Sequence, residues 1–367
     1  MVELIITEKP NAAERIANAL GDKKPTKKVI KKVPYYEITH NKKEIIVGCA
    51  VGHLFGLAET KKQGWTYPVF DVEWKPAYSL KKQSKFSKAY VDALTELTKK
   101  ADTFTIATDF DLEGEVIGYN CIRFICKQKD ARRMKFSTLT KDELVQSYEH
   151  ALQHLEFPMI AAGETRHYMD YFWGISLSRA LTLSVKAAGS FKLLSSGRVQ
   201  GPALKIIVER EREIRQFVPE PFWELTLTKD KLTAEYAGGN ITEKKTAENL
   251  LKKTKGKDGI VTSLKAAETA IQPPTPFDLT TLQTEAYRCF GISPKETLSI
   301  AQELYTSGLV SYPRTSSQKL PDSLGHKETI KKIAQQAEYN LLCKELLAQP
   351  KLVPREGEKS DPAHPSI

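Results

Sequence analysis

Apolar runs and amphipathic segments alternate over the first 148 residues of the chain. The runs at 2–7 (VELIIT) and 102–111 (DTFTIATDFD) have the apolar character of buried strands, and the segments at 11–20 and 115–126 have helical spacing. Strands that alternate with helices usually pair into parallel sheets. The pattern therefore predicts an α/β domain with a parallel sheet over residues 1–148.

Weaker signals predict further elements within this domain. The Lys-rich stretch 22–32 predicts an exposed loop, and 133–140 (RMKFSTLT) predicts a further strand. Thr140 stands three residues before Glu143, which predicts a capping box at the start of the next helix.

The pattern changes after residue 148. Helical spacing with interspersed arginines is followed by short alternating strands around a helix, the last strand at 259–264. Further on, Gly291 ends one predicted helix, and Ser293 with Pro294 begins the next. We predict a multi-domain chain of the α/β plus α+β class, divided into 1–148, 149–217, 218–276 and 277–367.

Charge and cysteine usage narrow the function classes. Lysine and arginine total 55 against 45 aspartates and glutamates, a net charge of +10. A basic surface favours nucleic acid, although a solvated lysine-rich surface explains the same count. The five cysteines form no C-x-x-C pair, which excludes a zinc ribbon from this sequence. With no signal peptide or membrane span expected, we predict a cytoplasmic protein.

An acidic cluster follows the predicted strand at 102–111. Asp109 and Asp111 share one face of an extended chain, at the sheet edge where α/β folds bind ligands, and Glu113 can join them. Mg²⁺ would relieve the repulsion between these carboxylates. The alternative is an acidic helix N-terminus, which the helix dipole also favours.

Glu8 ends the first predicted strand and would reach the same edge if its strand neighbours the one at 102–111. Lys9 follows it, either as a surface lysine or as a group that holds a phosphate. A strand-ending glutamate followed later by Asp-x-Asp-x-Glu resembles the TOPRIM domain, which occurs in type IA and type II topoisomerases, primases and some nucleases.

The segment SYPRTSS begins at Ser311 and places Tyr312 and Arg314 on one side of an extended chain. A phenol has a pKa of about 10 and is a poor nucleophile at neutral pH. A neighbouring guanidinium favours the phenolate and holds a phosphate by paired hydrogen bonds. On this segment alone, a tyrosine and an arginine on an exposed strand, without a catalytic role, explain the pattern better.

Longer motifs make the resemblance specific. GLVSYPRTSSQ resembles the active-site tyrosine motif of type IA DNA topoisomerases, and KSDPAHPSI resembles their histidine motif, at His364. GETRHYMDYFWGISLSRALT and SSGRVQGPALKIIVEREREIRQFVPEPFWEL resemble two further motifs. With TEKP and TDFDLEGE, they occur in the family's order across the whole chain, nearest to the archaeal topoisomerase I and topoisomerase III branch.

The resemblance implies a role for each matching residue. Tyr312 would attack a DNA phosphate and become linked to the 5′ end, Arg314 and Lys9 would contact that phosphate, and Glu8 would be the general acid. His364 would assist near the site, or would only cap a helix. The implied Mg²⁺ ligands are Glu8, Asp109, Asp111 and Glu113, and the implied DNA-binding residues are Arg166, Arg179, Arg198 and Gln200. Arg166 and Arg179, with Asp170, fit equally well as ion pairs that pack helices.

The implied activity is breakage of one DNA strand, passage of another and rejoining, which relaxes negatively supercoiled DNA. The sequence has no G-x-x-x-x-G-K-[ST] loop, in keeping with an ATP-independent enzyme. The four parts would be a TOPRIM domain, a helical DNA-binding domain, a β-rich arch segment and a winged-helix-like tyrosine domain. We expect a nucleoid-associated monomer that acts on single-stranded and negatively supercoiled DNA. The chain stops inside the histidine motif, so the alternative is a truncated, non-catalytic single-stranded DNA-binding fragment, or one half of a split enzyme with a separate C-terminal half.

Overall fold

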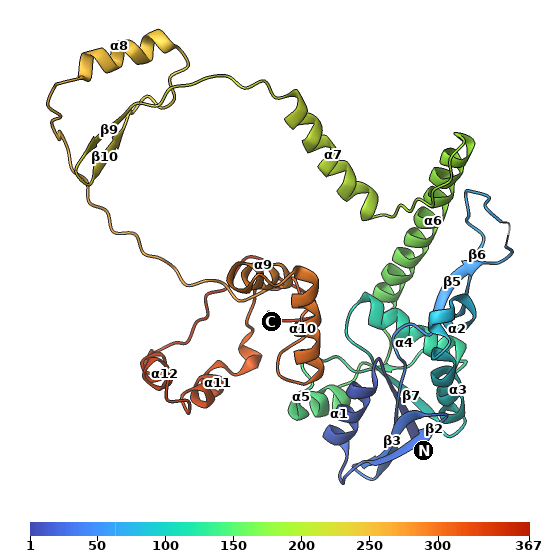
Figure 1. Ribbon diagram of the computed structural model, residues 1–367. Helices are drawn as coiled ribbons and strands as arrows, with labels where there is room; N and C mark the ends of the chain where they lie inside the picture. Colours follow the sequence, from blue (N-terminus) through green and yellow to red (C-terminus); the bar gives the residue numbers. More distant parts are fainter. Residues whose placement is uncertain (63) are drawn as a thin grey trace. The chain divides into compact units, whose positions relative to one another are not determined.

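A six-stranded sheet forms the centre of the N-terminal part of the protein. The structure is a computed structural model that describes residues 1–62 and 64–367. The strand order is β2-β3-β4-β1-β7-β8, and β2, β3 and β7 are labelled in Figure 1. The strands are β1 (Val2–Thr7), β2 (Thr26–Ile30), β3 (Val33–His40), β4 (Lys43–Cys49), β7 (Thr103–Ala107) and β8 (Arg132–Arg133). β1 runs parallel to β4 and β7, as the alternating pattern predicts.

Two antiparallel hairpins extend this sheet, so the predicted loop at 22–32 is wrong. β2 lies inside that stretch and pairs with β3, and β3 pairs with β4. Two-residue turns join them, with positive φ at Lys31 and Lys32 and at Asn41 and Lys42. Turns of this kind match the twist of a hairpin but usually contain glycine, which these lack.

Helices cover both faces of the sheet. α1 (Pro10–Leu20) and α5 (Lys141–Glu149) pack with Ile5 on one face. α3 (Ser87–Thr98) and α4 (Leu112–Phe124) pack with Leu4 and Ile6 on the other face. Burial on both faces explains why Leu4, Ile5 and Ile6 are consecutive apolar residues rather than an alternating pattern.

The boundary between the sheet and α5 differs from the sequence prediction. The predicted strand at 133–140 is reduced to β8, and Thr140 makes no side-chain cap. The Glu143 carboxylate instead accepts hydrogen bonds from the backbone N–H groups of Ser137, at 2.5 Å, and Thr138, at 3.1 Å. The glutamate therefore braces the preceding loop, and the predicted capping box is wrong.

Glycines let α4 approach the sheet closely. A Cβ atom at Gly118 would lie 2.5 Å from Ile106 Cγ2 on β7, and one at Gly114 would lie 2.0 Å from the Asp109 carbonyl oxygen. Since neither overlap is tolerable, glycine allows α4 to begin directly beside the Asp109 loop.

We expect Gly118→Ala to lower the free energy of unfolding by about 1–3 kcal/mol, because the added methyl group must displace β7 or α4. Gly197→Ala is the matched control, since nothing lies within 4 Å of a Cβ built there. Urea unfolding followed by circular dichroism measures both variants. Equal midpoints for the two would contradict close packing at Gly118.

The long helix α6 (Phe157–Ala187) packs against α4 and the hairpin of β5 (Phe55–Glu59) and β6 (Val72–Pro76). A Cβ atom at Gly163 would lie 2.5 Å from Val116 Cγ2, so α6 and α4 touch at this point. The short helices α2 (Ala77–Leu80) and η1 (Lys82–Ser84) follow β6. In the part of the chain that the structure describes, no helix combines the length and apolarity needed to cross a membrane.

The C-terminal part begins with two capped helices, α9 (Leu279–Phe290) and α10 (Pro294–Thr306). Gly291 ends α9 with a φ of 69°, and Ser293 Oγ accepts a hydrogen bond from the Glu296 N–H at the start of α10. The predicted stop and start signals are thus confirmed. Beyond them lie η2 (Asp322–Leu324), α11 (His326–Ile333) and α12 (Asn340–Leu347).

Residues Arg198–Gln272 form a separate compact unit. It contains α7 (Gln200–Gln216), the antiparallel pair β9 (Thr226–Lys229) and β10 (Leu232–Glu235), and α8 (Lys244–Thr254). The strand predicted at 259–264 is wrong, because this segment has no regular structure and its apolar side chains are exposed. Met1–Gly197 and Pro273–Ile367 together form the other unit.

Candidate active site

Carboxylates from two neighbouring strands meet at the carboxyl edge of the sheet. Glu8 follows β1 and Asp109 follows β7, and the two strands are parallel neighbours. Lys9 Nζ lies 3.1 Å from Glu8 Oε1 and 3.6 Å from Asp109 Oδ2. The sequence prediction that Glu8 reaches the aspartates depends on β1 and β7 being neighbours, and this adjacency is confirmed.

Two buried tyrosines face these carboxylates from the C-terminal part. Tyr312 Oη donates a hydrogen bond of 2.5 Å to Asp111 Oδ2, and Tyr305 Oη donates one of 3.0 Å to Asp109 Oδ1. Their ring centroids are 5.3 Å apart, and each side chain is only 2% exposed. Tyr305 lies on α10 and was missed by the sequence analysis, because its spacing there resembles that of an ordinary core residue.

His364 and Ser137 hold the Tyr312 segment in place. The Tyr312 N–H donates to the Ser137 carbonyl oxygen at 2.8 Å. His364 Nδ1 lies 2.8 Å from Ser137 Oγ, and Nε2 lies 3.0 Å from the Phe110 carbonyl oxygen. The centroids of the His364 and Tyr312 rings are 4.5 Å apart, with the two rings tilted by 41°. Burial lowers the pKa of this histidine. His364 thus lies against the tyrosine and caps no helix among the residues described.

Burial and crowding shift the acid–base properties of the site. Burial and the Asp109 charge raise the pKa of Glu8 to about 7, against the opposing effect of Lys9. Burial and the Asp111 charge raise the pKa of Tyr312, and the charge of the exposed Arg314 acts in the opposite direction. In this arrangement the phenol is neutral, and Glu8 carries a proton for part of the time at neutral pH.

A buried arginine supports the loop that carries the two aspartates. The Arg133 side chain is 0% exposed and donates to the Thr108 and Asp109 carbonyl oxygens, both at 2.9 Å. Its charge is balanced by Glu115, with Nε 2.5 Å from Oε1. Asp111 also caps α4 by accepting the Gly114 N–H at 2.7 Å. The aspartates are therefore held by contacts on both sides of the loop.

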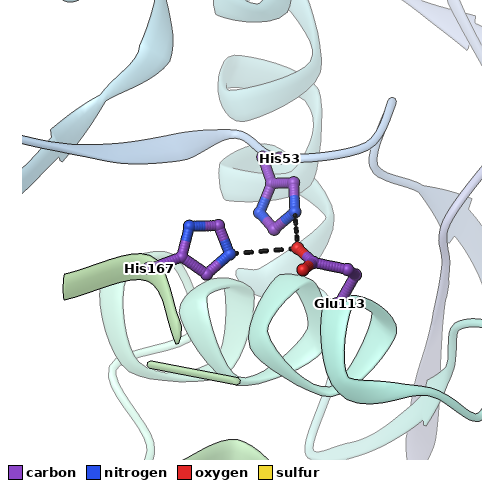
Figure 2. A group of neighbouring side chains, drawn as sticks. All are labelled: His53, Glu113 and His167. Carbon is purple, nitrogen blue, oxygen red and sulfur yellow. Dashed lines mark hydrogen bonds and ion pairs between the residues drawn. The ribbon is translucent and has the colours of Figure 1, made fainter. Parts of the chain in front are cut away.

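Glu113 belongs to a different cluster. His53 Nε2 and His167 Nε2 lie 2.9 Å and 3.0 Å from Glu113 Oε2 (Figure 2). Arg166 Nη1 lies 3.6 Å from Glu113 Oε1. Of the described histidines, cysteines and acidic residues, only His53, Glu113 and His167 form a group with metal-ligand spacing. The structure therefore does not bring the four predicted Mg²⁺ ligands into one cluster. The two histidines were missed, since each is isolated in the sequence.

The predicted DNA-binding residues lie in varied surroundings. Arg179 forms an ion pair with Glu59 and donates to the Thr66 carbonyl oxygen at 2.8 Å, which is the helix-packing arrangement considered as its alternative. Arg166 is half exposed and reaches both Glu113 and Asp170. Gln200 is exposed at the first turn of α7, and Arg198 precedes it at the start of the separate unit.

Comparison with known proteins gives one consistent result. A DNA topoisomerase family model matches residues 154–367, and a Toprim domain model matches residues 3–139. The chain is 46% identical to DNA topoisomerase 1 of Pyrococcus horikoshii over 99% of its own length and 54% of that protein. It is 47% identical to DNA topoisomerase 1 of Methanocaldococcus jannaschii, over 100% of its length and 48% of that protein.

The structure is also similar to that of full-length topoisomerase I from Thermotoga maritima. The TM-score is 0.66 at 27% identity, covering 91% of this chain and 52% of the other. The chain thus spans about half the length of the relatives it matches. With a Toprim domain, which is a divalent-metal-binding domain, and a topoisomerase domain in one chain, this protein belongs to the type IA DNA topoisomerase family.

Proposed function

We propose that the chain breaks and rejoins one strand of DNA through Tyr312 without ATP, and that this reaction relaxes negatively supercoiled DNA. The observation that carries the proposal is the buried contact between Tyr312 and Asp111, beside Glu8, Lys9 and Asp109. This contact puts a potential nucleophile next to a potential proton donor and a cation that can bind phosphate.

In the proposed cleavage step, Tyr312 Oη forms a bond to the phosphorus of a DNA phosphate while the bond to the 3′ oxygen breaks. The phenolic proton passes to a neighbouring carboxylate, for which Asp111 is in place at 2.5 Å. Glu8 gives its proton to the departing 3′ oxygen, and its raised pKa suits it to this role. Rejoining reverses each transfer. The Lys9 and Arg314 charges stabilise the phosphate oxygens.

The tyrosine segment has to move for DNA to reach this site. Tyr312 is 2% exposed, and its backbone and ring are held by Ser137 and His364. We infer that single-stranded DNA enters when this segment separates from the Asp109 loop. His364 would then hold Tyr312 in position when the tyrosine segment returns to the Asp109 loop.

Asp109 and Asp111 fit a hard divalent cation, for which we propose Mg²⁺. Both supply oxygen ligands, and their negative charges contribute to the raised pKa of Glu8, an effect that a cation would relieve. When bound, the ion would offset negative charge on the scissile phosphate. Glu113 and Glu8 would join the ligand set after a change of side-chain conformation, which for Glu113 means leaving His53 and His167.

Trapping of a covalent adduct tests the proposal. The chain is mixed with single-stranded DNA and Mg²⁺ and denatured with SDS, and DNA that remains attached to protein is measured. The second candidate is a chain that binds single-stranded DNA without cutting it, for which the net charge of +10 is the supporting observation. That candidate predicts DNA binding without an adduct.

Glu8 gives the metal-free protein a pH dependence of stability. The folded-state pKa of about 7 is above the value of 4.5 for an exposed glutamate. The folded chain therefore binds more protons than the unfolded chain between these values. The free energy of unfolding should fall as pH rises through this window, by about 2–3 kcal/mol.

Glu8→Gln removes the titrating group, so its free energy of unfolding should lack this component of the pH dependence. Urea unfolding in EDTA at a series of pH values compares the two proteins. If both lose the same stability between pH values near 4.5 and 7, Glu8 does not have a raised pKa.

A further inference from the structure

Three side chains from separate elements converge on one point beside the Toprim sheet. His53 comes from the loop between β4 and β5, Glu113 from the first turn of α4, and His167 from α6. Both imidazole Nε2 atoms point at the same carboxylate oxygen, Glu113 Oε2, at 2.9 Å and 3.0 Å (Figure 2). The side chains are 32%, 30% and 26% exposed, so solvent reaches the cluster.

Packing fixes these positions. Gly163 lets α6 touch α4, because a Cβ atom there would lie 2.7 Å from the Leu112 carbonyl oxygen. His167 follows one helical turn later on the same face of α6, which brings it to Glu113. On the other side, the loop that carries His53 is fixed to the end of β1, where the Gly52 N–H donates to the Glu8 carbonyl oxygen at 3.2 Å.

The ligand types differ from those of a magnesium site. Two imidazole nitrogens and one carboxylate oxygen suit Zn²⁺ and similar borderline cations, whereas Mg²⁺ prefers oxygen alone. Ligand atoms of a tetrahedral zinc ion lie about 3.3 Å apart, so each contact to Oε2 needs to lengthen by only a few tenths of an ångström. Arg166 approaches the other oxygen, Oε1, at 3.6 Å, which leaves Oε2 for the ion.

We propose that His53, Glu113 and His167 bind one borderline divalent cation such as Zn²⁺, with water in the fourth position. The ion ties α6 to α4 and to the loop after β4. It also keeps Glu113 away from Asp109 and Asp111. The ion at this site and the Mg²⁺ proposed at the two aspartates therefore compete for the Glu113 carboxylate. The site does not depend on the proposed DNA cleavage.

The competing explanation is a hydrogen-bonded network without an ion. The two histidines lower the pKa of Glu113 by hydrogen bonding to its carboxylate, so the metal-free arrangement has its own stabilisation. His53 Nδ1 is buried without a hydrogen-bond partner, and because it is the ring nitrogen that faces away from Glu113, it does not distinguish the two explanations. Binding measurements separate the two explanations, because only the first predicts uptake of zinc.

The test is titration of the EDTA-stripped 367-residue chain with Zn²⁺ by calorimetry, without DNA and with excess Mg²⁺ present throughout. We expect one zinc ion per chain, a rise in Tm on binding, and the visible absorption of tetrahedral Co²⁺ when cobalt replaces zinc. His53→Gln and His167→Gln should each weaken zinc binding by about 100-fold or more, since each removes a ligand.

His154→Gln is the matched control. His154 also lies against a carboxylate, with Nδ1 2.6 Å from Asp130 Oδ2, but no second histidine joins that pair among the described metal-ligand groups. Its zinc affinity should equal that of the unaltered chain. Circular dichroism checks that each variant is folded, and His167→Asn serves if His167→Gln is not. The proposal is overturned if the unaltered chain binds zinc no more tightly than the folded His53→Gln and His167→Gln variants.

Discussion

Replacing Tyr312 with phenylalanine is expected to abolish the covalent protein–DNA adduct completely while DNA binding remains. Phenylalanine keeps the ring that packs 4.5 Å from His364 and 5.3 Å from Tyr305. It removes only the hydroxyl group that reaches Asp111. The variant should therefore fold normally and lack the atom that attacks phosphorus.

Labelling one end of the DNA at a time shows which of the two DNA fragments is covalently attached to the protein. A 5′-phosphotyrosine bond leaves the protein on the downstream fragment, so a 3′-end label should enter the protein band and a 5′-end label should not. Gel electrophoresis after SDS treatment measures both, and a mobility shift without SDS measures binding.

Tyr305→Phe is the matched control for this experiment. It removes a hydroxyl group from the neighbouring ring and the hydrogen bond to Asp109, but leaves the proposed nucleophile. Its adduct should persist. An adduct in Tyr312→Phe would refute the assignment of the nucleophile. Binding without any adduct in the unaltered chain would favour the non-catalytic fragment.

The parts of the fold that the sequence predicted are those with strong local signals. β1 and β7 are largely buried, and each has consecutive apolar residues, Leu4 to Ile6 in β1 and Ile106 with Ala107 in β7. The α9–α10 corner is set by Gly291 and Ser293, whose conformations depend on their immediate neighbours. β2 was missed because it is an edge strand with exposed lysines, and charges on such a strand prevent edge-to-edge pairing rather than mark a loop.

The site was predictable only where the order of strands brings residues together. Glu8 and Asp109 meet because their strands are parallel neighbours. The contacts of Ser137 with Tyr312 and of His53 with Glu113 join residues far apart in the sequence, and no local pattern reports them. The sequence spacing alone grouped Glu113 with the two aspartates. In the structure its side chain points to His167 on α6 and to His53 in the loop after β4.

Removal of the buried arginine should produce the largest loss of stability in the Toprim domain. Arg133→Met leaves Glu115, which is also 0% exposed, as a buried charge without its partner. It also removes the donors to the Thr108 and Asp109 carbonyl oxygens. We expect the free energy of unfolding to fall by about 3–5 kcal/mol.

Arg132→Met is the control for this loss. Arg132 is the preceding residue but is 27% exposed, and Glu3, its partner at 3.4 Å, keeps Lys43 at 2.6 Å. Its replacement should cost about 1 kcal/mol, measured by urea unfolding of both variants. A double variant, Arg133→Met with Glu115→Leu, should recover part of the loss, because no unpaired charge then remains buried.

Urea unfolding of these variants also separates the cost of leaving Glu115 as an unpaired buried charge from the cost of other lost contacts. If Arg133→Met and Arg132→Met unfold at the same urea concentration, the fully buried Arg133–Glu115 pair contributes nothing beyond the partly exposed Arg132–Glu3 pair. If the double variant is no more stable than Arg133→Met, the loss comes from the unsupported carbonyl oxygens and not from Glu115. In that second case Arg133 acts mainly by holding the loop that carries Asp109 and Asp111. Adduct formation should then fall together with stability in Arg133→Met and in the double variant.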